Sequence, residues 1–187
     1  YTFKQFLPEY TLSEEELLSF LGPPLRESFA RYLSGHQVDE AVQVYRAYNR
    51  EKHNDYVTLY PHETEVLKKL HEEGIKMAIV TTKYKDAAVY GLKCADLDQY
   101  FDVVIGSDEV THGKPHPEAL RVALSHLNAT KGYMIGDNVT DIQAGKNAGI
   151  GTIGVTWSLK GTQLLLEEHP DYMMESYDDL YQYLERM

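Results

Sequence analysis

The chain is poor in cysteine and in basic residues. Cys94 is the single cysteine, which excludes an internal disulfide framework and fits a reducing compartment, so we expect a cytoplasmic protein with Cys94 packed in a helix. The chain contains 18 Lys and Arg residues but 29 Asp and Glu residues, so its formal net charge is −11. This charge argues against nucleic acid and anionic membranes as partners. No apolar run approaches the length of a membrane span. An anionic substrate therefore needs a locally positive site.

The first 58 residues are expected to form a helical domain. Ser13 followed by Glu16 has the spacing of a capping box, which predicts the start of a helix. The segment Gly22-Pro23-Pro24 ends that helix, and further helices are predicted over Leu25–Leu33 and Val38–Tyr56. Since this part shows no convincing strand, we assign residues 1–58 to a small, tyrosine-rich helical domain and residues 59–187 to a second domain.

Residues 59–187 alternate between short apolar runs and amphipathic segments. Strands are predicted over Ile75–Thr81, Asp102–Gly106, Tyr133–Ile135 and Gly151–Thr156, and helices over Glu63–Glu73, Asp86–Ala95, Pro117–Leu127 and Thr140–Ala148. A helix, a short strand and a helix follow to Met187. Strands that alternate with helices imply βαβ units, so we predict an α/β fold with a parallel sheet.

Two carboxylates follow the predicted strand at residues 133–135. Asp137 comes in a Gly-Asp turn, and Asp141 comes four residues later at the start of a helix. In an open α/β sheet, ligands bind at the carboxyl ends of the strands. Hard oxygen donors at such a place suit Mg²⁺ rather than zinc. The structural alternative is a turn that uses Asp as a helix cap.

Hydroxyl groups and cations follow two other predicted strands. Thr81-Thr82-Lys83 comes after the strand at residues 75–80, and Lys114 is flanked by a Pro-x-Pro segment before a helix. Phosphoryl transfer requires Mg²⁺ between carboxylates and phosphate oxygens, a lysine to offset charge, and hydroxyl donors. Taken singly, Thr81 is typical of a strand end and Lys114 of a solvated surface. Together with the two carboxylates they favour a phosphoryl-transfer site.

The chain resembles the haloacid dehalogenase superfamily of phosphatases over nearly its whole length. Thr81 matches the second motif of that family, Lys114 the third, and Gly136-Asp137-Asn-Val-Thr-Asp141 the fourth. The likeness is greatest to the phosphoglycolate phosphatase and pyrophosphatase branch, through Leu21–Phe29, Val80–Lys83, Gly113–Glu118 and Val155–Gly161. The resemblance implies a Rossmann-like core with a small helical cap, and hydrolysis of a small phosphorylated substrate with Mg²⁺ through an aspartyl-phosphate.

The same resemblance implies a role for each matching residue. Asp137 would hold Mg²⁺, with Asp141 assisting directly or through water. Lys114 would screen the nucleophile and the phosphoryl group from each other's charge, and Thr81 would donate to a phosphate oxygen. Thr82 and Lys83 are further candidate substrate contacts.

The first motif of this family, Asp-x-Asp-Gly-Thr, is not present in the 187 residues. The one Asp-x-Asp segment, Asp96-Leu97-Asp98, precedes a predicted strand and is expected to be a turn at the end of a helix. We therefore expect the nucleophile in a segment that precedes Tyr1. Its strand would lie at the centre of the sheet, between the strands that end at Thr81 and Gly136.

Three readings of the function stay open. The first is the phosphatase, for which Arg26 in the helical domain is a candidate contact to the distal anionic end of a compact substrate; the alternative for Arg26 is a solvated surface position. The second is a sugar phosphomutase with the same core residues. The third is a truncated, non-catalytic protein that binds a phosphorylated ligand. We expect a monomer or homodimer.

His112 and His116 have the spacing of zinc ligands on a helix, but Pro115 and Pro117 exclude that helix. Both histidines are therefore predicted to be loop residues.

Overall fold

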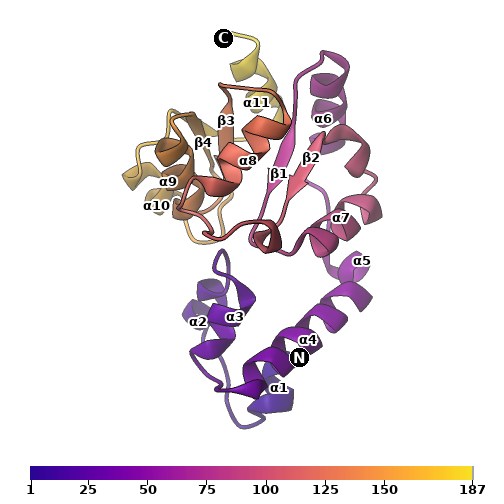
Figure 1. Ribbon diagram of the computed structural model, residues 1–187, viewed down its shortest axis with the longest axis vertical. Helices are drawn as coiled ribbons and strands as arrows, with labels where there is room; N and C mark the ends of the chain where they lie inside the picture. The colour runs from indigo at the N-terminus through magenta and orange to yellow at the C-terminus, as the bar shows by residue number, and fades with distance from the viewer. Residues whose placement is uncertain (187) are drawn as a thin grey trace. The chain divides into compact units, whose positions relative to one another are not determined.

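The computed structural model describes residues 1–186 and divides the chain into two compact units, Tyr1–Thr58 and Leu59–Met187. Figure 1 labels their elements. The expected last element runs to Met187, which lies outside the described residues. Within residues 1–186, every helix is too short or too polar to cross a membrane.

The first unit contains only helices. They are α1 (Thr2–Phe6), α2 (Glu14–Ser19), α3 (Leu25–Ala30), α4 (His36–Glu51) and α5 (His53–Tyr56). The capping box at Ser13 is confirmed, because the Glu16 N–H donates to Ser13 Oγ at 3.2 Å and the Ser13 N–H donates to Glu16 Oε2 at 2.8 Å. The predicted helix at 38–56 is broken at Lys52, and the short α1 was not predicted at all.

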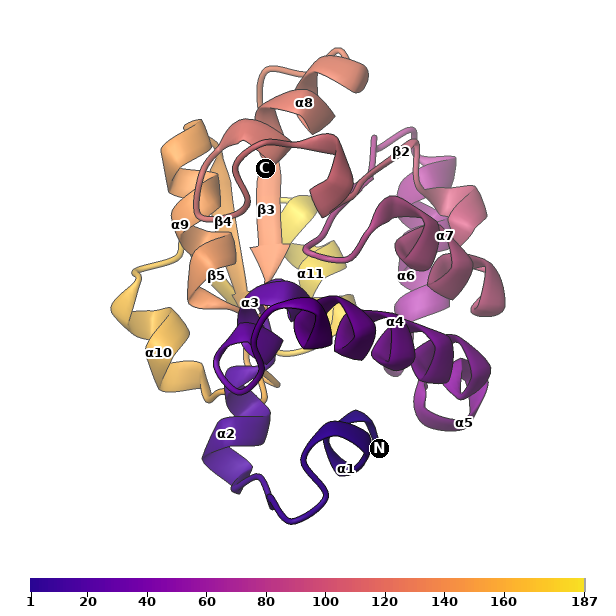
Figure 2. The same ribbon diagram turned by 60° about the horizontal axis from the view of Figure 1, so that its bottom comes forward.

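An aromatic core holds this unit together. Phe29, Leu33, Val38 and Ala41 are buried, with Phe3, Phe20 and Tyr32 packed against them. In Figure 2, α4 runs as one long helix beside α3 and α1. The ring of Phe29 lies 5.9 Å from that of Phe3 and 5.7 Å from that of Phe20 between centroids, and such aromatic contacts add large apolar areas to a small core.

The second unit contains five parallel strands among its described residues. They are β1 (Ala78–Val80), β2 (Val103–Ile105), β3 (Tyr133–Gly136), β4 (Gly151–Val155) and β5 (Tyr172–Met174). The α/β class and the parallel pairing are as predicted from the sequence. The predicted strand at 75–81 is shorter than expected, since only Ala78–Val80 pairs with β2.

The strands form two separate sheets. β1 pairs with β2, and β3, β4 and β5 pair in that order, so that no ladder joins β1 to β3 within residues 1–186. Figure 1 shows the two sheets as separate sets of arrows in this unit. Ile135 on β3 remains 37% exposed, which is unusual for the middle of a parallel strand.

Helices cover the sheets and set the positions of the loops. The helices are α6 (Glu63–Glu72), α7 (Lys85–Cys94), α8 (Glu118–His126), α9 (Val139–Ala148), α10 (Thr162–Glu167) and α11 (Tyr177–Leu184), with short 3₁₀ turns η1 (Asp98–Tyr100) and η2 (Ser107–Glu109). Most of their ends agree with the sequence-based boundaries to one or two residues. Gly145 lets α9 approach β4, because a Cβ there would lie 2.5 Å from Thr152 Cγ2. Close packing of α9 on the sheet fixes the position of its N-terminus, which lies directly after the end of β3 (Figure 2).

Two smaller expectations have different outcomes. Cys94 is exposed at the end of α7, so the prediction that it packs within a helix is wrong; α7 has no fully buried residue among its ten. Asp96-Leu97-Asp98 is a turn at the end of α7, as predicted, with Asp96 at a φ of 55° and Asp98 as the first residue of η1.

Candidate active site

Lys114 and Asp141 form an ion pair that joins the two sheets. Lys114 Nζ lies 2.6 Å from Asp141 Oδ1, and the two side chains are 10% and 7% exposed. Lys114 Nζ also donates to the backbone oxygen of Val80, the last residue of β1, at 3.0 Å. A lysine from a loop thus connects the end of β1 with the helix that follows β3. A sequestered ion pair is favourable only when further hydrogen bonds accompany it, and here the ammonium of Lys114 has a second partner in the Val80 oxygen.

The turn between β3 and α9 fixes the Asp141 carboxylate. Asp141 lies in the first turn of α9, and its Oδ2 accepts the Asn138 N–H at 3.0 Å. This contact caps the helix and adds to the attraction of the helix N-terminus for negative charge. Gly136 is required beside it, because a Cβ there would lie 2.3 Å from Asp141 Cβ and 2.5 Å from its Oδ2.

Asp137 differs from Asp141 in its exposure. Its side chain is exposed at the end of β3, where Oδ1 accepts a hydrogen bond from Asn138 Nδ2 at 2.9 Å. The Asp137 backbone oxygen accepts a hydrogen bond from Ser158 Oγ at 2.7 Å. Ser158 follows the end of β4 and was not singled out from the sequence, although its place after a parallel strand was a usable signal.

The segment after β1 forms a compact turn. The Thr81 N–H continues the sheet by donating to the Ile105 oxygen at 3.0 Å, and Thr81 Oγ1 accepts the Lys83 N–H at 3.1 Å. Thr82 is half-buried and Lys83 is exposed. Because Lys114 contacts Val80, the residue before Thr81, the hydroxyl groups and the lysine belong to the same end of β1.

The loop that carries Lys114 is tied to α9. Residues 111–117 contain no helix, the Lys114–Pro115 peptide is cis, and Asn147 Nδ2 donates to the Pro115 oxygen at 2.9 Å. This contact holds the backbone next to Lys114 against the helix that carries Asp141. The structure therefore brings Thr81, Lys114, Asp137 and Asp141 to one edge of the second unit.

Arg26 belongs to the other unit. It is exposed on α3, and its guanidinium forms an ion pair with Asp39 on α4. Its charge is thus engaged within the helical unit, in an exposed pair of the kind that contributes little to stability.

The carboxylates of this site are oxygen donors of the kind that bind Mg²⁺. Asp137 offers an exposed carboxylate, a hard oxygen donor of the kind that Mg²⁺ takes together with water. Both oxygens of Asp141 are already engaged, one by Lys114 and one by the Asn138 N–H. These residues fit a magnesium site: Asp137 offers a direct ligand, and the second lone pairs of the Asp141 oxygens allow that residue to assist directly or through water. Hydroxyls, carboxylates and a lysine at the ends of parallel strands are typical of an α/β enzyme that handles anionic groups.

The chain belongs to the haloacid dehalogenase-like hydrolases, whose family model matches residues 1–155. It is therefore an enzyme of the hydrolase class. The pyrophosphatase PpaX of Listeria monocytogenes serotype 4b is 45% identical over 181 residues, which cover 96% of this chain and 83% of that protein. PpaX of Bacillus velezensis is 45% identical over 168 residues, covering 89% of this chain and 77% of that protein.

Solved structures of the same family share the fold. A haloacid dehalogenase-like hydrolase from Streptococcus pneumoniae superposes with a TM-score of 0.84 at 30% identity, over 98% of this chain and 87% of that one. A structure described as a predicted phosphatase from Clostridium acetobutylicum gives a TM-score of 0.84 at 25% identity, over 100% of this chain and 88% of that one. The resemblance stated from the motifs is confirmed at the level of the family.

Proposed function

We propose that this enzyme is a Mg²⁺-dependent phosphohydrolase that acts on pyrophosphate or a similarly small phosphorylated metabolite through an aspartyl-phosphate. One observation carries the proposal: the sequestered Lys114–Asp141 pair lies at the end of β1, and the exposed carboxylate of Asp137 stands in the turn from β3 to the helix that carries Asp141. A cation held by a fixed carboxylate and by a backbone oxygen is preorganised to meet a phosphoryl group. Such preorganisation is the main source of electrostatic catalysis.

Each residue contributes a separate interaction in this proposal. Asp137 would hold Mg²⁺, which when bound neutralises phosphate charge and orients the phosphoryl oxygens. Lys114 would offset the charge of the phosphoryl group while Asp141 fixes its ammonium. The hydroxyl of Thr81 would donate its hydrogen to a phosphate oxygen while its oxygen still accepts the Lys83 N–H. Thr82 and Lys83 would contact the remaining phosphate oxygens.

Pyrophosphate is the preferred substrate within this proposal. The relatives at 45% identity are named pyrophosphatases. Structures titled phosphoglycolate phosphatase are similar at 18–19% identity, which supports the fold alone. Arg26 would contact the distal end of the substrate only if it exchanged its partner Asp39 for that anion. The single cysteine and the acidic charge support a cytoplasmic enzyme without nucleic-acid partners.

The nucleophilic carboxylate is proposed to come from a segment that precedes Tyr1. In support, β1 and β3 each have a ladder on one side only within residues 1–186. A strand between β1 and β3 would form hydrogen bonds with the free backbone N–H and C=O groups of both. Each such group left buried and unpaired would cost about 1–3 kcal/mol of folding free energy. In this view residues 1–58 are a cap lacking its first residues, and residues 59–187 are a core lacking its first strand.

The test uses the complete gene product. Phosphate release from pyrophosphate, phosphoglycolate and a hexose phosphate would be measured at fixed Mg²⁺ and after exhaustive chelation. We expect pyrophosphate to have the highest kcat/KM and activity to vanish without the metal. Faster turnover of the hexose phosphate would reject the substrate assignment, and full activity after chelation would reject the metal. An unchanged KM for each substrate in Arg26→Ala would place Arg26 outside the site.

A further inference from the structure

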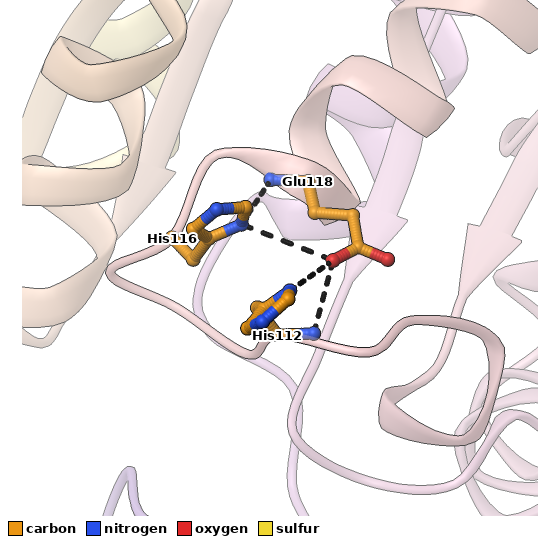
Figure 3. A group of neighbouring side chains, drawn as sticks. All are labelled: His112, His116 and Glu118. Atoms are coloured by element: carbon orange, nitrogen blue, oxygen red, sulfur yellow. Dashed lines mark hydrogen bonds and ion pairs between the residues drawn. The ribbon is translucent and has the colours of Figure 1, made fainter.

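Two histidines of the loop before α8 lie close to a glutamate in the first turn of α8, as Figure 3 shows. His112 Nδ1 lies 3.0 Å from Glu118 Oε2, and His116 Nδ1 lies 3.9 Å from the same oxygen. The two imidazole rings are 4.6 Å apart between centroids. One potential ligand atom from each residue lies within 4.8 Å of the other two. The two histidines that the sequence predicted as loop residues therefore form one cluster with Glu118, the first residue of α8.

The glutamate of this cluster is held in place by the backbone. Glu118 Oε1 accepts the Thr111 N–H at 2.8 Å, and Oε2 accepts the His112 N–H at 3.0 Å. The backbone N–H of Glu118 in turn donates to His116 Nδ1 at 3.3 Å. These contacts connect Glu118 with Thr111 and His112 at one end of the loop and with His116 at the other. Hydrogen bonds of this kind orient ligand groups before a metal ion arrives.

We propose that His112, His116 and Glu118 form a binding site for a divalent transition-metal ion of the Zn²⁺ class. Imidazole nitrogens favour Zn²⁺, Ni²⁺ or Cu²⁺ over Mg²⁺, which prefers oxygen donors. Bonds of about 2.0–2.2 Å in a tetrahedral zinc site separate neighbouring ligand atoms by roughly 3.3–3.5 Å. The distances of 3.0 and 3.9 Å to Glu118 Oε2 fall on either side of that range, so small side-chain rotations suffice.

The site is an open one. His112 and His116 are exposed and Glu118 is partly so, which gives an ion direct access from solvent. Three protein ligands leave a fourth position for water, as in zinc sites that are not purely structural. The ion would replace the direct contact between His112 Nδ1 and Glu118 and the long contact of 3.3 Å to His116 Nδ1. Glu118 keeps both backbone donors when the ion binds through the second lone pair of Oε2.

The site shares its loop with Lys114 but uses none of the same ligand groups as the proposed magnesium site. Lys114 lies midway in sequence between His112 and His116, and its ammonium contacts Val80 and Asp141 instead of the cluster. An ion held by both histidines would close this loop around its central residue. Bound metal should therefore slow amide hydrogen exchange in residues 111–118 without any change at Asp137.

The inference is tested with Zn²⁺ and Co²⁺ added to the complete protein in excess Mg²⁺. Calorimetry follows Zn²⁺, and the visible absorption of Co²⁺ reports its ligands. We expect one Zn²⁺ per chain, resistant to Mg²⁺, and an affinity at least about tenfold weaker in both His112→Ala and His116→Ala. His62→Ala is the matched control, since His62 contacts Asp178 at 2.5 Å as an exposed histidine–carboxylate pair.

His116→Ala is the decisive variant, because His116 makes only long contacts with Glu118 and its removal should leave the loop folded. Unchanged Zn²⁺ affinity in this variant would overturn the proposal. The absence of Mg²⁺-resistant binding to the wild-type protein would do the same. If Asp137→Asn removes the binding while His116→Ala retains it, the ion occupies the phosphoryl site instead.

Discussion

Gly136 and Asp141 touch across the turn that ends β3, with the ideal Cβ position of Gly136 only 2.3 Å from Asp141 Cβ. The absence of a side chain at residue 136 is what allows the carboxylate of Asp141 to lie against the strand and reach Lys114 at 2.6 Å. The position of the Lys114 ammonium therefore depends on Gly136, the last residue of β3.

Gly136→Ala should accordingly move Asp141 and weaken its contact with Lys114. Since the space is filled, overpacking should lower the free energy of unfolding by about 1–3 kcal/mol. Urea unfolding of the variant measures this change. Gly132→Ala is the control, because a Cβ at Gly132 meets nothing within 4 Å. Equal stability of the two variants would contradict the packing account.

Asp137→Asn should separate activity from folding. Asp137 is exposed, and an exposed substitution of this kind usually changes stability by no more than about 0.5 kcal/mol. As the proposed direct ligand, however, its loss should abolish Mg²⁺-dependent turnover. Unfolding curves and phosphate release at several Mg²⁺ concentrations give both quantities. Retained turnover with an unchanged dependence on Mg²⁺ would remove Asp137 from the metal site.

Much of this site followed from the sequence because strand ends and their polar residues are local features. Thr81, Lys114, Asp137 and Asp141 all lie at or near the carboxyl ends of parallel strands. Their exact partners could not be predicted. Asp141 is bound to Lys114 and to the Asn138 N–H, whereas Asp137 is exposed. This difference depends on the directions of the two side chains, which cannot be read from the sequence motif.

The remaining differences also have physical causes. Helix α1 lacks a side-chain cap and an acidic first turn, so the sequence carried no start signal for it. The helix break at Lys52 interrupts a helical pattern that is otherwise continuous, and nothing in the composition marks it. The cluster of His112, His116 and Glu118 depends on the path of a proline-containing loop, for which helical spacing is not a guide.

Acid should destabilise the helical unit through Glu16. A hydrogen bond from the Tyr10 hydroxyl, followed by that from the Ser13 N–H, lowers the pKa of Glu16 from 4.5 to about 2. Because the folded state favours the charged carboxylate, its contribution is complete above pH 4.5 and is lost as the pH falls through about 2. The difference in Tm between the wild type and Glu16→Gln should therefore be largest near neutral pH and shrink across this range.

Thermal melts followed by circular dichroism between neutral pH and pH 2 measure that difference. Glu14→Gln is the matched control, since Glu14 is an exposed residue in the same first turn of α2. Its Tm should follow that of the wild type at every pH. A difference for Glu16→Gln that is constant with pH would show that the carboxylate charge is not involved.

The catalytic role of Lys114 is measured most directly by the kcat of Lys114→Ala in the complete protein, with pyrophosphate and saturating Mg²⁺. The ammonium acts on charge that develops in the transition state, so we predict a fall of about two orders of magnitude or more. Lys76→Ala is the control, because Lys76 forms an ion pair of similar length, 2.8 Å, with Asp102 next to β1 and is far more exposed. We expect near-normal kcat for Lys76→Ala. Wild-type kcat in folded Lys114→Ala would contradict the catalytic role of Lys114.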